Sequence, residues 1–143
     1  MITFEKSISI ACPRQEVFDY FVDAASQSEW SSSTESSEWT TDPPHGVGSK
    51  TKDVIKLLGR RIESESEITA WDPPGMAASK VTKPFPGEFT ARFSEQGEGT
   101  ELTLRAQGEL SGIFKIAEGL LKGQVEKSFE ADLNALKLIL ESR

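Results

Sequence analysis

Three polar residues, Asp53, Ser64 and Ser66, are the strongest candidates for chemistry in this sequence. They lie in two alternating segments on either side of residues 58–61, where glycine is placed as the first central residue of a two-residue hairpin turn. A turn centred on Gly59 and Arg60 pairs Asp53 with Ser66 and leaves Ser64 two residues along the same, inward face. Polar groups on an inward face are costly unless they bond each other, water or a ligand. We expect them to line a cavity and orient the polar end of a ligand; the alternatives are that they satisfy one another or face solvent.

The opposite face of the same hairpin carries charges. In this register Lys56 faces Glu63 and Lys52 faces Glu67, and opposite charges that pair across two strands support the register. Alternating glutamates also suit acid–base catalysis by paired carboxylates. With lysines opposite them, the pattern favours a solvated face of ion pairs.

The remaining reactive residue types are isolated. The only histidine, His45, lies in a turn rich in proline and glycine, and the only cysteine, Cys12, follows a predicted strand. A metal site needs several ligands, and the sequence has no cluster of cysteine and histidine and no G-x-S-x-G nucleophile motif. The sequence therefore predicts no metal, no cofactor and no assigned catalytic residue, and it predicts that Cys12 is a small buried side chain.

Length and charge restrict the class of protein. The 143 residues suit one domain, residues 1–143. Lysine and arginine total 16 against 23 acidic residues, a net charge of −7 without a basic cluster, which disfavours binding to nucleic acid or an anionic membrane. The first ten residues do not resemble a signal peptide, and no apolar run has the length of a membrane span. We expect a cytoplasmic monomer or homodimer without membrane insertion.

The elements that must position these residues are mostly strands. Period-two alternation predicts strands at residues 2–11, 38–40, 51–57, 62–68, 76–82, 89–93 and 102–106. Two short helices are predicted after the first strand, one at residues 13–22 and one that Asp23 caps and that runs toward Trp30.

A long amphipathic helix is predicted at residues 113–140. Its apolar residues recur at helical spacing: Ala117, Leu121, Val125, Phe129, Leu133, Leu136 and Leu140. Such a helix must lie across the sheet to bury its stripe, and a curved sheet closed by one helix tends to enclose a space for a ligand. Gly119 and Gly123 interrupt good helix formers, which indicates room for a ligand, close approach of a strand or chain, or a helix that begins near Gln124.

The order of one strand, two short helices, six strands and a long helix resembles the START/Bet v 1-like superfamily, also called SRPBCC, and its polyketide cyclase/dehydrase-like branch in particular. Five local patterns carry the resemblance: the Ala-x-Pro-x-x-x-Val-aromatic run in residues 11–18, Trp30 at the end of the second short helix, the glycine pair in residues 46–49, the turn at residues 71–74, and Phe93 with residues 97–100.

The resemblance implies an α+β helix-grip fold, a seven-stranded antiparallel sheet wrapped around the long C-terminal helix with a cavity between them. Members bind lipids, sterols, plant hormones, polyketides or quinones, and some are cyclases or aromatases without a shared catalytic motif. The candidate ligand-binding residues are those expected to line such a cavity: Trp30, Asp53, Ser64, Ser66, Phe89, Phe93, Leu121 and Val125.

Three functions are compatible with a fold that encloses such a cavity. The first is binding of a small hydrophobic molecule with one polar end. The second is a cyclase or dehydratase that uses Asp53 as acid or base, its pKa raised by burial; the absence of inward His, Tyr or Lys in the readable strands disfavours it. The third is a protein–protein partner module, which a large exposed apolar patch would support. The sequence favours the first and leaves turnover open.

Overall fold

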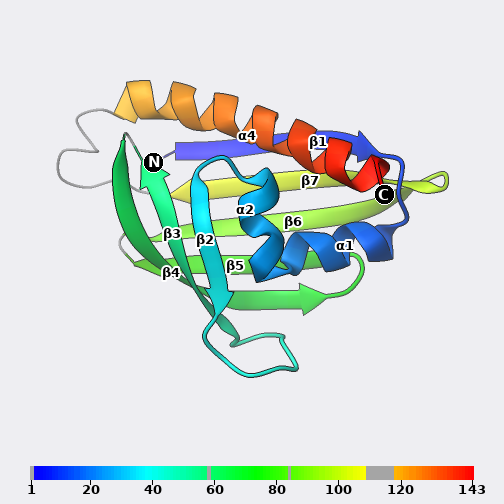
Figure 1. The fold of residues 1–143 in the computed structure, drawn as a ribbon, viewed down its shortest axis with the longest axis horizontal. Helices are drawn as coiled ribbons and strands as arrows, with labels where there is room; N and C mark the ends of the chain where they lie inside the picture. The colour runs from blue at the N-terminus through cyan, green and yellow to red at the C-terminus, as the bar shows by residue number, and fades with distance from the viewer. Residues whose placement is uncertain (1, 58, 84, 109–117) are drawn as a thin grey trace.

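The computed structural model describes residues 2–57, 59–83, 85–108 and 118–143, and in it seven antiparallel strands form one curved sheet (Figure 1). The strands are β1 (Ile2–Ile10), β2 (Thr34–Trp39), β3 (Lys50–Leu57), β4 (Arg60–Asp72), β5 (Met76–Lys83), β6 (Gly87–Gln96) and β7 (Gly99–Gly108). Their spatial order is β1-β7-β6-β5-β4-β3-β2, so the two ends of the sheet are consecutive strands in the sequence.

The helices lie on one side of this sheet. Helix α1 (Arg14–Val22), the 3₁₀ turn η1 (Ala24–Ser26) and α2 (Gln27–Trp30) follow β1, and α4 (Glu118–Glu141) runs along β1 (Figure 1). The predicted helix-grip α+β fold is confirmed. None of the helices in the described parts of the chain combines the length and the apolar character that a membrane crossing requires.

Asp23 separates the short helices, as the sequence predicts. Its carboxylate accepts hydrogen bonds from the Ala25 backbone N–H at 3.2 Å and from the Ser26 hydroxyl at 2.8 Å. The side chain therefore satisfies a donor that the start of the 3₁₀ turn leaves free. The chain turns there and brings Ala24 into the core.

Helix α4 continues through both of its glycines. A helix that begins near Gln124 is therefore wrong, while the predicted residues 113–117 lie outside the described ones. A Cβ built on Gly119 or Gly123 meets nothing within 4 Å, so close approach of a strand does not account for either glycine.

Three hydrogen bonds from two separate segments, residues 11–12 and Ser32, connect α4 to the rest of the fold. The Ala11 N–H donates to Glu141 Oε2 at 2.8 Å, and the buried Cys12 thiol donates to the Leu140 carbonyl at 3.2 Å. Farther along the helix, the Ser32 N–H donates to the buried Asp132 carboxylate at 2.9 Å. The prediction that Cys12 is a buried strand-end residue is confirmed, and burial raises the pKa of its thiol.

The register of the β3–β4 hairpin differs from the predicted one by two residues. Asp53 pairs with Ser64, not with Ser66, and Leu57 pairs with Arg60, so that Gly59 is the second central residue of the turn. Gly59 has φ +76°, a conformation that glycine adopts without steric cost. Because side chains alternate with a period of two, the shift changes the partners and leaves Asp53, Ser64 and Ser66 on their predicted face.

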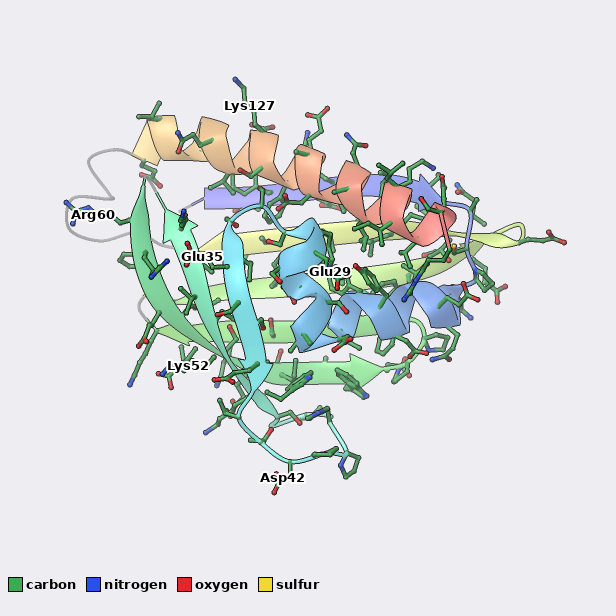
Figure 2. All side chains as sticks on the ribbon, viewed as in Figure 1. Glu29, Glu35, Asp42, Lys52, Arg60 and Lys127 are labelled. Carbon is green, nitrogen blue, oxygen red and sulfur yellow. The ribbon has the colours of Figure 1, made fainter. Side chains whose placement is uncertain are left out.

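The charged outer face of this hairpin is confirmed, but the predicted pairs Lys56–Glu63 and Lys52–Glu67 are wrong. Lys52 Nζ lies 3.8 Å from Glu63, and Lys56 Nζ lies 3.3 Å from Glu35 on β2. Figure 2 shows Lys52 and Arg60 reaching outward from the hairpin. Such exposed pairs are screened by water and contribute little to stability, so they do not select one register strongly.

Candidate functional site

A pocket of about 210 Å³ lies between the concave face of β2–β6 and the segment from α1 to α2. Its apolar and aromatic lining residues are Phe21, Val22, Ala24, Trp39, Ile68, Trp71, Ala77, Ala78, Val81 and Phe89. Its polar lining residues are Gln27, Thr34, Ser37, Thr51, Asp53, Ser66 and Ser79. A hollow that combines apolar and aromatic side chains with polar groups is the usual form of a small-molecule site.

Asp53 is the only ionisable residue among those lining residues. It lies in the middle of β3, and its Oδ1 accepts a 2.5 Å hydrogen bond from the Ser37 hydroxyl of the adjacent strand β2. Burial raises the pKa of the Asp53 carboxyl, and the bond from Ser37 opposes that rise. None of the ion pairs in the described chain involves Asp53. The pocket therefore holds a carboxyl group without a cation beside it.

The two serines predicted to accompany Asp53 have different places. Ser66 lines the pocket opposite Thr51. Ser64 is the direct neighbour of Asp53 on β4, but it is buried and its hydroxyl donates to the Lys83 carbonyl at 3.1 Å. The structure thus brings Asp53 and Ser66 to the pocket, while Ser64 supports the backbone behind it.

Trp39 and Trp71 form an aromatic wall of the pocket. Trp39 and Trp71 meet edge to face with centroids 6.4 Å apart, and the imidazole of His45 stacks on Trp39 at 3.9 Å. Trp71 reaches this wall because β4 has an irregularity between Ile68 and Ala70. A strict period of two from Ile68 would place Ala70 inward, so a bulge, which alternation does not reveal, brings Trp71 into the site.

Trp30 and Phe93 lie behind the pocket wall. Phe93 is 1% exposed and meets Phe18 and Phe21 edge to face at 5.3 and 5.5 Å. Trp30 stacks on Phe21 at 5.2 Å, and its buried Nε1 has no hydrogen-bond partner among the described residues. Neither side chain lines the pocket, so both belong to the core beneath it.

Of the remaining predicted ligand-binding residues, which lie on β6 and on the long helix, some line the pocket and others do not. Phe89 lines the pocket, the half-buried Val125 does not, and the side chain of Leu121 lies outside the described ones. Phe129 of α4 packs against Phe89 at 6.1 Å and against Phe4 at 5.6 Å. These rings occupy space between α4 and the sheet. The pocket lies under α1 and α2, and none of the described side chains of α4 lines it.

The sequence does not mark several of the lining residues as part of a binding site. Phe21 and Val22 belong to the apolar face of a predicted short helix, and Ser37 lies in a segment rich in serine and threonine. Ser37 becomes identifiable only when β2 is paired with β3, because that pairing places it directly beside Asp53. A metal site has no support in the described chain, where no group of three or more His, Cys, Asp or Glu side chains is suitably placed.

Replacing Asp53 by asparagine is expected to stabilise the ligand-free protein at neutral pH by about 1 kcal/mol, because burial of the carboxylate charge is compensated only in part by the bond from Ser37. The pKa of Asp53 is raised in the folded state, so the folded state binds a proton more tightly than the unfolded state. Stability is therefore lost as the pH rises from the ordinary carboxyl pKa through the folded pKa. Asparagine has no charge to desolvate and can still accept the bond from Ser37.

Urea unfolding at pH 7 and at about pH 3, where the carboxyl is protonated in both states, measures this difference. The gain is expected at pH 7 and absent at the lower pH. Asp42→Asn, in the exposed loop labelled in Figure 2, is the charge-matched control. A wild-type protein as stable as Asp53→Asn at pH 7 would show that burial of Asp53 has no cost.

Comparison with known proteins agrees with this architecture. The profile of the family described as polyketide cyclase/dehydrase and lipid transport matches residues 1–141. Among curated proteins no match is found.

Solved structures share the whole fold at low sequence identity. A protein of Thermus thermophilus, TTHA0849, is 19% identical with a TM-score of 0.84, and the match covers 98% of this chain and 97% of that one. The ZhuI aromatase/cyclase of a Streptomyces species is 19% identical with a TM-score of 0.82, over 99% of this chain and 94% of that one. A START superfamily protein of Mycobacterium smegmatis is 12% identical with a TM-score of 0.77, over 99% of each chain.

The profile match spans nearly the whole chain, and the seven-stranded sheet with its long C-terminal helix is the architecture that the sequence resemblance implies. The chain therefore belongs to the polyketide cyclase/dehydrase and lipid transport family.

Proposed function

We propose that this protein binds a small, largely apolar molecule in the pocket under α1 and α2, and that Asp53 and the neighbouring hydroxyls hold the ligand's polar group. The observation that carries the proposal is the Asp53 carboxyl, which faces an apolar hollow and has Ser37 as its hydrogen-bond partner. A buried polar group is stabilised when a ligand completes its hydrogen bonds. Family membership supports the same function.

The size of the pocket supports a compact ligand. Its volume of about 210 Å³ lies below the roughly 300–1,000 Å³ typical of sites for drug-sized molecules. The aromatic wall of Trp39 and Trp71 offers flat apolar surface on which a ring can pack. A ring compound suits this space better than a long-chain lipid does.

One observation favours proton transfer as a second candidate function. Burial raises the pKa of the Asp53 carboxyl. A raised pKa is typical of carboxyl groups that act as acid or base in enzymes. No His, Tyr, Lys or Arg side chain joins it among the described lining residues, so a second proton carrier would have to come from the ligand or from water. Binding without turnover needs nothing further from the chain and is the simpler function.

Titration with phenethyl alcohol, a small neutral aromatic probe, tests the proposal. The indole N–H signals of Trp39 and Trp71 in proton–nitrogen correlation spectra are expected to shift saturably, because both rings line the pocket. The signal of Trp30, buried behind Phe21, is expected to shift less and acts as an internal reference.

A variant that fills the pocket is expected to lose binding of phenethyl alcohol. Ser79 lies on the inward face between Ile68 and Phe89, so Ser79→Phe is expected to abolish saturation. Ser94→Phe makes the same substitution at an exposed site on β6 and is expected to bind like the wild type. Unsaturable shifts in the wild type, or equal binding by Ser79→Phe, would contradict the proposal. Mass spectrometry of the protein purified from cells would then identify the natural ligand.

A further inference from the structure

The charge of the pocket restricts the polar group that a ligand can carry. Asp53 is acidic, and the described lining includes no Lys, Arg or His side chain to balance an anion. A carboxylate or phosphate placed here would meet a second negative charge in a partly desolvated site, which is strongly unfavourable. The chemistry of the lining therefore disfavours anionic ligands.

Acceptor groups at the same end of the pocket are well placed for a donor-rich group. Ser37 donates to Oδ1 of Asp53, and no described hydrogen bond reaches Oδ2. Thr51 and Ser66 face each other in the neighbouring row of side chains, and their hydroxyl oxygens can also accept. An ammonium group has three donors and no acceptor, so it matches one carboxylate oxygen and two hydroxyl oxygens.

The apolar wall also suits a positive charge. The face of an indole ring attracts cations, more strongly when water is excluded. Trp39 and Trp71 both line the pocket, and the stacked His45 supports Trp39. At longer range, the net charge of −7 raises the local concentration of cations around the protein.

From these features we infer that the pocket selects a small aromatic amine, with its ammonium group on Asp53 and its ring against Trp39 and Trp71. The inference rests on the proposed function, because it specifies the ligand class of the same site. A bound cation favours the carboxylate form of Asp53 and opposes the effect of burial on its pKa. Binding of the cation to the protonated carboxyl therefore releases a proton to solvent, and affinity is expected to rise with pH until Asp53 is ionised.

Three probes that share one ring and differ in the polar end test this inference: phenethylamine, phenethyl alcohol and hydrocinnamate. At neutral pH and low ionic strength, the wild type is expected to bind the amine about tenfold more tightly than the alcohol, the scale of one charge-assisted hydrogen bond. The carboxylate is expected to bind most weakly. Dissociation constants come from the Trp39 and Trp71 indole signals.

The matched variants are Asp53→Asn and Asp42→Asn, which remove the same charge inside and outside the pocket. Asp53→Asn is expected to bind amine and alcohol equally, whereas Asp42→Asn keeps the tenfold preference. Alcohol binding with no preference for the amine would overturn the inference and leave the proposed function standing. An amine preference that survives in Asp53→Asn would overturn it as well, and binding of none of the probes would overturn both.

Discussion

Replacement of Phe93 by alanine is expected to lower the free energy of unfolding by about 3–5 kcal/mol. The ring is 1% exposed and contacts Phe18 and Phe21 of α1 edge to face. Its removal leaves a cavity in the layer that joins α1 to the sheet, and the surrounding rings cannot close it without leaving their own contacts. Equilibrium unfolding in urea measures the loss.

Phe89→Ala is the matched control, because Phe89 lies on the same face of β6, four residues before Phe93. It is half-buried and already borders the open pocket, so its removal costs mainly the transfer free energy of the ring, about 1–3 kcal/mol. Phe89→Ala is also expected to weaken binding of phenethyl alcohol. Equal losses of stability in the two variants would show that Phe93 does not belong to a separate core behind the pocket.

Leu136→Ala is expected to destabilise the protein by about 2–5 kcal/mol. Leu136 is 0% exposed and belongs, with Leu133 and Leu140, to the stripe through which the C-terminal half of α4 joins the core. Alanine is a good helix former, so the helix itself is retained and the loss reports on its packing against the core. Thermal and urea unfolding both measure it.

Leu138→Ala makes the same substitution two residues later on the outer side of the helix. Leu138 is 70% exposed, and surface substitutions of this kind change stability by no more than about 0.5 kcal/mol. The two variants share their effect on helix propensity, so their difference isolates burial. A similar small loss in both would mean that α4 is not held against the core in solution.

The close-packed core and the pocket lie on different sides of the sheet's strand order. The side containing β1, β6, β7, α1 and the end of α4 holds the close-packed core, including Phe18, Phe93, Leu102 and Leu136. The side containing β2–β5 carries the polar row and the open pocket. The close-packed core and the pocket lining are therefore largely separate sets of residues.

The sequence by itself determined the architecture and the faces of its strands. Period-two alternation places Thr51, Asp53, Ser66 and Ile68 inward whichever of two registers is adopted, because a shift by two residues preserves the face. The order of elements and the apolar stripe of the last helix likewise require a helix packed on an antiparallel sheet.

Only the tertiary structure decided which residues meet. The charges of the β3–β4 hairpin repeat every two residues, so both registers offer opposite charges as neighbours and the charges do not decide between them; the observed pairing sets Asp53 beside Ser64. The irregularity in β4 brings Trp71 to the pocket, whereas strict alternation predicts that Ala70 faces inward at this point. Phe4, Phe89 and Phe129 pack together between α4 and the sheet, and the pocket lies under α1 and α2. Each of these depends on contacts between segments distant in the chain, which local periodicity does not encode.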